Sequence, residues 1–447
     1  MRSKALAAAV LVALVAAART GHPAALALGK PGITPLPCAD LAWEKIDPKF
    51  DALPGAHAYF GEYDGGLYRV EVPDNWNGEL ALYAHGFVGY TTLQLRVQNS
   101  PIREHLIKSG IAWAASSYRC NGYTPGQGLA DTMLLPELFT RLNGGKAPQR
   151  VYLTGTSMGG HVTLLGMHEF PKAFAGGLAM CPAGPELFDF FAAVGGAAEV
   201  ITGQTFTLDT MQADLAKMTD LLGKPPDYTL KGRQLASVEI LISGGPRPFA
   251  WEGLASRFLG NINGAAIAGG TTPSNRAVMT THIKYSIDET LGLSADALNA
   301  RARRKAYDAA FRSAKGPYEE LVPFDGKLDR PTLTMHGTSD LFVPIVLEQR
   351  LKQAVHASGK DKLLTQRVYR VPGHCGFSQP EMTKAFDDLS AWVHHGTKPE
   401  GDEVEGDLSN AGMKFTSPLR PGDPGGLTVR LKADPTGSVE AGFSRPK

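Results

Sequence analysis

The stretch from residue 150 to residue 170 constrains the fold of this chain more than any other. A strand-like apolar run, RVYLTG, leads into the turn TSMGG, and the helix-like run HVTLLGMHEF follows at once. Gly155, Gly159 and Gly160 lie close around Ser157. Glycine is used where side chains would collide or where the backbone needs a positive φ. The stretch therefore predicts a strand that turns sharply into a helix, with Ser157 at the turn.

Strand-like and helix-like segments alternate on both sides of this turn. Such alternation predicts an α/β fold, with a mostly parallel central sheet and helices on both faces. The expected strands lie near residues 68–72, 79–86, 111–119, 150–157, 175–181, 331–337 and 364–373. The expected helices lie near residues 92–109, 131–143, 161–170, 345–359 and 381–396, with Pro136 as a complication in the second.

The alternation stops between residues 183 and 330, where helices are expected near 209–223 and 294–315. We therefore expect an α/β core in two parts, 28–182 and 331–398, with an insertion between them. The tail at 399–447 is rich in Gly, Pro and Asp. It is expected to hold a hairpin, with GLTVRLKA as one strand, or to be partly disordered.

The first 27 residues have the composition of an export signal. Arg2 and Lys4 precede the apolar run ALAAAVLVALVAAA, and ALA at 25–27 offers a cleavage site. The run is shorter than the ~20 apolar residues that span a bilayer. We therefore favour a secreted or periplasmic protein, with no membrane attachment after cleavage, over a short membrane anchor. The net charge of +1 argues against nucleic acid as a partner, and the sequence indicates no oligomeric state.

The chain has four cysteines, and because an exported protein enters an oxidising compartment, we expect one or two disulfides among them. Cys38, Cys120, Cys181 and Cys375 allow three pairings, and the sequence does not choose among them. The chain has no CxxC pair and no Cys/His cluster, so we expect no metal site. It also has no Walker or dinucleotide-binding pattern, so we expect no cofactor.

The five residues from Gly155 to Gly159 match the pattern G-x-S-x-G. At a strand-to-helix turn, this pattern lifts a serine hydroxyl above the carboxyl end of the sheet. The free N–H groups at the helix N-terminus then face a developing negative charge. The alternative is a glycine-rich turn without chemistry. A serine hydroxyl also needs a base, and the base needs an orienting acid.

His374 and Asp340 are the expected base and acid. His374 follows a strand in the stretch PGHCGF, and Asp340 lies six residues beyond Thr334, in the loop after the strand at 331–337. Both loops leave the carboxyl end of the sheet, so we predict a Ser157–His374–Asp340 triad. The alternatives are an exposed loop histidine and an aspartate that caps the following helix.

Two further groups of residues are expected around the triad. Backbone N–H groups of Phe87 and Met158 would meet the negative oxygen of a tetrahedral intermediate. His85 and His336, each followed by glycine, are expected to be structural. A substrate pocket is expected from the aromatic side chains of ELFDFF, although these side chains could instead pack the insertion onto the core. These side chains are Phe188, Phe190 and Phe191.

Four motifs together resemble the α/β-hydrolase superfamily: AHGF at 84–87, GTSMGG at 155–160, HGTSDLFVP at 336–344 and PGHCGF at 372–377. They occur in the order nucleophile, acid, base, which is the order in this superfamily. The resemblance covers about residues 65–181 and 331–396, and it implies a serine hydrolase with a helical cap at 183–330.

A secreted esterase that acts on a small-molecule or polymeric ester is the leading expectation. One alternative is a serine peptidase of the same fold, in which Glu186 or Asp189 would bind a substrate amine. The other is a non-catalytic binding protein on a hydrolase fold.

The tannase and feruloyl-esterase group is similar in having a cysteine directly after the catalytic histidine, as Cys375 follows His374. That group also has a cysteine directly before its serine, where this chain has Thr156. The disulfide of that group is therefore missing here. The resemblance leaves Cys375 to pair with Cys181 or Cys120.

Overall fold

The computed structural model describes residues 41–47, 49–89, 92–205, 211–268, 278–306, 324–371 and 373–417. Within these ranges it does not describe the side chains of 211–213, 215, 259 and 262–268. The expected signal peptide at 1–27 and the strand expected at GLTVRLKA lie outside the described residues, as does part of the helix expected at 294–315.

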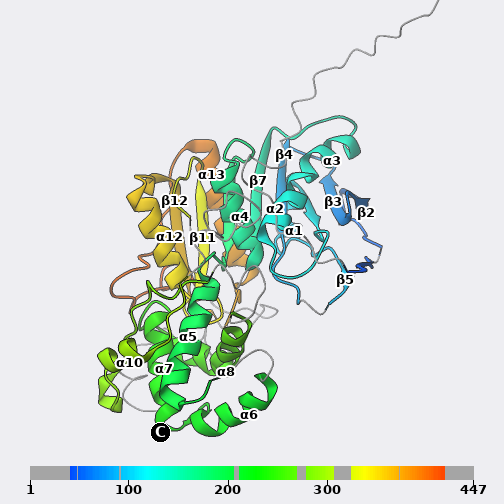
Figure 1. The fold of residues 1–447 in the computed structure, drawn as a ribbon. Coiled ribbons are helices and arrows are strands. Elements are labelled where there is room, and N and C mark those ends of the chain that lie inside the picture. The colour runs from blue at the N-terminus through cyan, green and yellow to red at the C-terminus, as the bar shows by residue number, and fades with distance from the viewer. Residues whose placement is uncertain are drawn as a thin grey trace, which may run out of the picture.

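A single eight-stranded sheet forms the centre of the molecule (Figure 1). Its strands run in the order β12 (Leu364–Tyr369), β11 (Thr332–Gly337), β8 (Gly176–Met180), β7 (Arg150–Thr156), β4 (Glu79–Ala84), β6 (Ala112–Ser116), β3 (Gly66–Pro73) and β2 (Ala56–Tyr63). Two neighbouring pairs in this sheet, β2 with β3 and β3 with β6, are antiparallel, and the other five are parallel. The mostly parallel sheet predicted from the sequence is therefore confirmed.

Helices cover both faces of the sheet, and β6 shows why. Ala112 and Ala114 belong to one hydrophobic cluster and Trp113 and Ala115 to another, because successive side chains of a strand point to opposite faces. Helices α2 (Pro125–Met133), α3 (Leu135–Leu142), α4 (Met158–Glu169) and α12 (Val346–Ala357) contribute to the first cluster. Helices α1 (Arg103–Lys108) and α13 (Gln379–His395) contribute to the second.

A second group of helices lies beyond the carboxyl ends of the strands (Figure 1), in the region expected as an insertion. Its role as a cap stays a prediction. The group consists of α5 (Leu187–Thr202), α6 (Met211–Leu222), α7 (Leu230–Ile242), α8 (Ala250–Ala268) and α10 (Ala295–Arg301), with the short turn η1 (Glu289–Leu291) and the small pair β9 (Gly223–Lys224) and β10 (Asp227–Tyr228).

Proline changes two of the expected helices. The helix expected at 92–109 is wrong in its first half, where β5 (Gln94–Leu95) pairs with β1 (Glu44–Lys45) and α1 begins only at Arg103. Pro101 disfavours helical geometry in the residue before it, so the helix forms after it. The helix expected at 131–143 is split into α2 and α3, and Pro136 lies in the first turn of α3, where its missing N–H costs nothing.

Residues 399–417, the described part of the expected tail, pack along the edge strand β12. The N–H of Asp402 donates to the carbonyl of Gln366 at 2.7 Å, and its carboxylate accepts from the N–H of Val368 at 2.8 Å. Val404, Leu408 and Ala411 are buried against Ile345 and Val368. This segment therefore covers an edge that would otherwise expose unpaired backbone groups.

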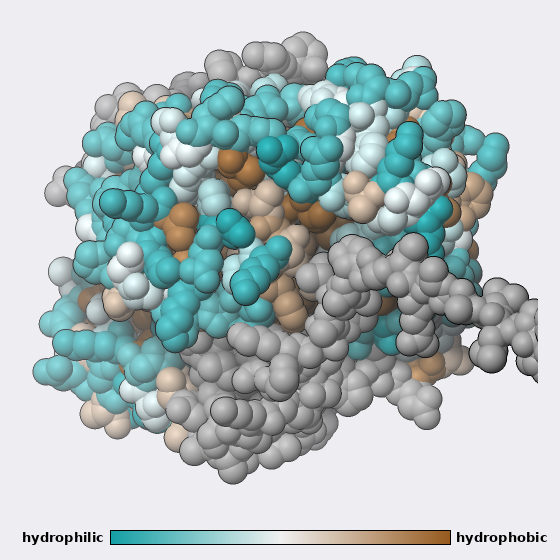
Figure 2. Space-filling model, turned by 90° about the horizontal axis from the view of Figure 1, so that it is seen from above, coloured by the Kyte–Doolittle hydropathy of each residue, from teal (hydrophilic) through white to brown (hydrophobic). Residues whose placement is uncertain are grey.

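The end of the molecule opposite α5–α8 is mainly hydrophilic, with small hydrophobic areas between polar side chains (Figure 2). Among the helices of the described ranges, none has both the length and the hydrophobicity that crossing a bilayer requires.

Candidate active site

Ser157 lies on the turn between β7 and α4, with its backbone at φ 59° and ψ −119°. Positive φ is uncommon outside glycine and costs about 1–3 kcal/mol, so the surrounding structure must hold it. The N–H of Ser157 donates to the carbonyl of Met180 at 3.0 Å. Its own carbonyl accepts from the N–H groups of His161 and Ala183, both at 3.1 Å. Hydrogen bonds on both sides of the serine therefore fix the strained turn.

Close approach of the backbone explains the glycines around Ser157. A Cβ on Gly155 would lie 2.1 Å from the carbonyl oxygen of Gly159. A Cβ on Gly159 would lie 1.9 Å from the carbonyl oxygen of Ala84, at the end of β4. A Cβ on Gly160 would lie 2.6 Å from Cα of Pro182. Each of these positions excludes a side chain, so α4 can start directly against the ends of the neighbouring strands.

His374 bridges Ser157 and Asp340. The hydroxyl of Ser157 donates to Nε2 of His374 at 2.7 Å, and Nδ1–H of His374 donates to Oδ2 of Asp340 at 2.6 Å. These donor assignments follow because the carboxylate can only accept. The three side chains come from the loops after β7, β11 and β12, and the structure brings them together at the carboxyl end of the sheet.

Asp340 is fully buried, and its second oxygen accepts from the N–H groups of Phe342 at 3.0 Å and Val343 at 2.9 Å. Burial alone would raise the pKa of Asp340, but the charge and hydrogen bond of His374 outweigh it and hold that pKa below its usual value. The carboxylate therefore stays ionised. It caps the turn that follows and contacts the histidine at the same time.

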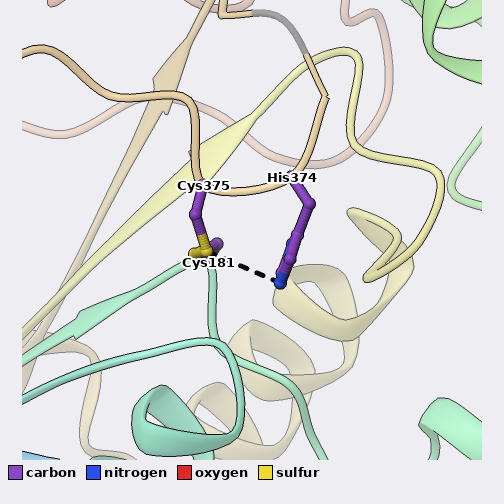
Figure 3. Close-up of side chains that lie close together, drawn as sticks. All are labelled: Cys181, His374 and Cys375. Atoms are coloured by element: carbon purple, nitrogen blue, oxygen red, sulfur yellow. Dashed lines mark hydrogen bonds between the residues drawn. A yellow bond between two sulfur atoms is a disulfide. The ribbon is translucent and has the colours of Figure 1, made fainter. Parts of the chain in front are cut away.

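Cys181 and Cys375 form a disulfide beside His374 (Figure 3), with their Cα atoms 5.4 Å apart. Of the two partners that the resemblance left for Cys375, the structure thus pairs it with Cys181. Sγ of Cys375 lies 3.5 Å from Nε2 of His374. The two sulfurs are bonded to each other, so neither is a thiolate that could ligate a metal. Cys120 is disulfide-bonded as well.

The backbone after β4 passes alongside the serine. A Cβ on Gly86 would lie 3.3 Å from Cβ of Ser157. Phe87 follows, with its side chain 39% exposed. On the other side, Met158 is the first residue of α4, and its N–H donates to no acceptor in the part of the chain that the structure describes. A free N–H at this position is normal for a first helical turn.

His85 directly follows β4, His336 is the penultimate residue of β11, and both are buried. The ring nitrogens of His85 lie 2.7 Å and 3.1 Å from the carbonyls of Gly86 and Ser117. Those of His336 lie 3.0 Å and 2.9 Å from the carbonyls of Gly337 and Val343. Burial lowers the pKa of both, that of His336 to about 4. These contacts with backbone agree with the structural role expected for both.

The phenylalanines of α5 lie in the packed interior, because Phe188, Phe190 and Phe191 are 7%, 3% and 4% exposed. Phe191 does not contact His374 directly, but the ring of Phe342 lies between them. Its ring centroid is 5.8 Å from that of Phe342, and Phe342 stands edge-on to His374 at 5.3 Å and 84°. Their role in a substrate pocket stays a prediction.

The carboxylate of Asp189, considered for binding a substrate amine, is buried within the helical region. It accepts from the N–H of Met279 at 2.7 Å and lies 3.9 Å from Nε2 of His282. Glu186 lies at the N-terminal cap of α5.

Arg247 is a residue near the triad that the sequence did not single out. It is 3% exposed, and it donates to the carbonyl of Thr338 at 2.8 Å and to that of Gly245 at 2.7 Å. A third nitrogen lies 3.5 Å from the carbonyl of Asp340. Burial lowers the pKa of Arg247 to about 10, against the opposing effect of the Asp340 charge. An arginine in the Gly/Pro-rich run SGGPRPF is typical of an exposed loop, so no sequence signal indicated this contact.

Comparisons with known proteins give distant structural similarities. No family model matches the chain, and no curated protein matches it. Feruloyl esterase B from Aspergillus oryzae is similar over 77% of this chain and 81% of its own, with a TM-score of 0.43 and 14% identity. An acylaminoacyl peptidase from Pyrococcus horikoshii is similar over 79% of this chain but 44% of its own, with a TM-score of 0.40 and 10% identity. The esterase Pf2001 from Pyrococcus furiosus covers 78% of this chain and 97% of its own, with a TM-score of 0.36 and 12% identity. On its own strand order and connections, the chain has the α/β-hydrolase fold.

Proposed function

We propose that the protein is a serine hydrolase that cleaves carboxylic esters, with Ser157 as the nucleophile. The observation that carries this proposal is the pair of hydrogen bonds made by one imidazole, to Ser157 at 2.7 Å and to Asp340 at 2.6 Å. A hydroxyl, an imidazole and a buried carboxylate in this order form the constellation of acyl transfer.

In the first half of the proposed reaction, Oγ of Ser157 attacks the ester carbonyl carbon while Nε2 of His374 takes its proton. The negative carbonyl oxygen receives hydrogen bonds from the N–H groups of Met158 and Phe87, and the N-terminus of α4 favours this charge. The bond to the alcohol then breaks, and His374 gives its proton to the departing oxygen. The acyl group stays on Ser157 as an ester.

In the second half, His374 takes a proton from water while that water attacks the acyl carbon. The tetrahedral intermediate collapses, the carboxylic acid leaves, and Ser157 recovers its proton from His374. Asp340 remains ionised throughout. It holds Nδ1–H in place and stabilises the imidazolium that forms twice per cycle.

The helices α5–α8 act as a cap in this proposal. They lie over the carboxyl end of the sheet (Figure 1), and Arg247 from the α7–α8 connection hydrogen-bonds the loop that carries Asp340.

We also propose export with cleavage after residue 27, because the N-terminal composition and a disulfide both fit an oxidising compartment. Mass spectrometry of the protein recovered from the culture medium or periplasm would identify its first residue. An intact N-terminus would contradict cleavage.

The direct test of the chemistry compares the protein with Ser157→Ala. A fluorophosphonate probe should label Ser157, and p-nitrophenyl esters should be hydrolysed far faster than aminoacyl p-nitroanilides. Ser157→Ala should lose labelling and turnover. Ser358→Ala is a matched control, because Ser358 lies at the C-terminal end of α12 and bonds only backbone carbonyls. Amide turnover equal to ester turnover would favour a peptidase, and no labelling would favour a non-catalytic protein.

A further inference from the structure

One face of α8 lies against the loop that carries Asp340. A Cβ on Gly253 would lie 1.8 Å from the carbonyl oxygen of Ser339, so the helix backbone touches this loop directly. Arg257 follows Gly253 by four residues and precedes Gly260 by three, so all three share one face of the helix. A Cβ on Gly260 would lie 3.5 Å from Cζ of Arg257. This is an ordinary van der Waals distance, so the guanidinium packs along the helix surface beside Gly260.

The Arg257 guanidinium lies one aromatic ring away from the proposed base. Its Cζ is 3.9 Å from the centroid of the Phe342 ring, a distance at which a cation is attracted to the ring face. The same ring stands edge-on to His374, with centroids 5.3 Å apart. Arg257 also lies close enough to Asp340 for that carboxylate to affect its pKa.

Arg257 lacks the polar partners that a half-buried cation normally has. Its Nε is buried without a hydrogen-bond partner, and no carboxylate or carbonyl in the described ranges pairs with the guanidinium. Burial lowers the pKa of Arg257, and the charge of Asp340 offsets this only in part. Arg247, in the same region, donates to three acceptors at 3.1 Å or less. An unsatisfied buried donor costs about 1–3 kcal/mol, and the two Nη groups, which are not buried, also have no hydrogen-bond partner in the described ranges.

We propose that Arg257 binds a carboxylate of the substrate. This proposal rests on the proposed ester hydrolysis and narrows its substrate class to esters that carry a second, free carboxylate. A guanidinium grips a carboxylate through two parallel N–H bonds in its own plane. Cζ of Arg257 lies over the Phe342 ring, and of the guanidinium nitrogens only Nε is fully buried, so the two Nη groups can reach a ligand. The carboxylate belongs either to the acyl part or to the alcohol part of the ester.

Two pairs of esters separate these sources. For the acyl part, 4-nitrophenyl hydrogen adipate is compared with 4-nitrophenyl hexanoate, which has the same chain length without the charge. For the alcohol part, 4-acetoxybenzoate is compared with 4-acetoxybenzamide. Both kcat and KM are measured for the full-length, oxidised protein and for Arg257→Gln, Arg257→Lys and Arg303→Gln. Arg303 is the matched control, because its side chain is 70% exposed and pairs with Glu199.

We expect the unsubstituted protein to prefer the charged ester in one of the two pairs. Arg257→Gln should lower the ratio of kcat/KM between charged and neutral ester by about 10–100-fold, mainly through KM. Arg257→Lys should keep part of this ratio, because lysine keeps the positive charge but lacks the two parallel N–H donors of the guanidinium. Arg303→Gln should keep all of it.

Equal losses on the charged and the neutral ester would overturn the proposal, because they would assign Arg257 to packing around Phe342 and Asp340. Absence of any preference in both pairs would also overturn it. If Arg257→Gln does not fold, inhibition of hexanoate hydrolysis by the free products decides. Adipate but not adipamide should compete if the carboxylate is on the acyl part, and 4-hydroxybenzoate but not 4-hydroxybenzamide if it is on the alcohol part. Failure of all four esters to react would instead contradict the ester hydrolysis on which this inference rests.

Discussion

The disulfide between Cys181 and Cys375 joins the two loops that set the distance between Ser157 and His374. Cys181 follows Met180, whose carbonyl accepts from the N–H of Ser157, and Cys375 directly follows His374. The N–H of Cys181 also donates to the carbonyl of Met335 in β11 at 2.7 Å. One covalent bond therefore connects the surroundings of the serine with the loop that carries the imidazole.

Removal of this disulfide should loosen the histidine loop. The double variant Cys181→Ala/Cys375→Ala should lose about 2–4 kcal/mol in the free energy of unfolding, a typical contribution for a native disulfide. Ester hydrolysis should fall because His374 no longer stays in register with Ser157. Urea denaturation and kcat measure the two effects. The double variant is preferable to a reductant, because Cys120 is also disulfide-bonded. Unchanged kcat would show that the loop holds His374 without the disulfide.

Asp340→Asn should abolish most activity while leaving the fold intact. The asparagine oxygen can still accept from the N–H groups of Phe342 and Val343, but its NH₂ group would then face Nδ1 of His374. This stabilises the wrong tautomer of the imidazole, so kcat should fall on the order of 10⁴-fold. Asp329→Asn is the matched control, since Asp329 makes an exposed ion pair with Lys360. A similar loss in both variants would argue against a specific role for Asp340.

Ser157→Gly should be more stable than Ser157→Ala. Both variants remove the hydroxyl, but only glycine relieves the φ of 59° at this position. The relief of about 1–3 kcal/mol exceeds the cost of the more flexible unfolded chain, so we expect a net gain of about 1 kcal/mol. Urea denaturation of the two inactive variants measures the difference directly. Equal stability would mean that the turn stores no strain.

The parts of this fold that could be predicted are those encoded locally. Strands buried on both faces are mainly apolar runs, so β4, β6 and β8 were recognisable, and β11 was recognisable from threonines that alternate with apolar residues. Ser157 could be singled out because steric exclusion requires the glycines around it. His374 and Asp340 could be assigned because loops after parallel strands meet at one edge of a sheet. Chain order and the alternation of strands and helices are enough to place both residues at that edge.

The rest depends on contacts between segments far apart in the chain. Helix α5 has Gly195 and Gly196 in its middle, which argue against a helix in sequence terms. The structure uses Gly196 as a contact point, since a Cβ there would lie 2.9 Å from the hydroxyl of Tyr285. Arg247 and Arg257 gain their surroundings from the Asp340 loop, more than 80 residues further along the chain. No local pattern marks an arginine for such a contact.

The buried carboxyl group of Glu348 should make the stability of the protein depend on pH. Glu348 lies in α12 and is 1% exposed. One carboxyl oxygen accepts from the hydroxyl of Thr334 at 2.7 Å and from Nε2 of Gln366 at 2.5 Å. The other has no partner in the described ranges. Burial outweighs these hydrogen bonds and raises the pKa of Glu348 from 4.5 to about 7.

The folded protein therefore keeps a proton on Glu348 that the unfolded chain loses above pH 4.5. Stability from this group is complete below pH 4.5, falls as the pH rises, and is lost above about pH 7, a change of roughly 3 kcal/mol. Glu348→Gln cannot ionise, so its advantage over the unsubstituted protein should grow across this window. Urea denaturation at intervals between pH 4.5 and pH 8 measures the difference, in which contributions from other titrating groups cancel. Glu104→Gln, on the exposed side of α1, is the matched control and should show no such growth. A constant difference between Glu348→Gln and the unsubstituted protein would mean that Glu348 is already ionised in the fold, with its free oxygen hydrated.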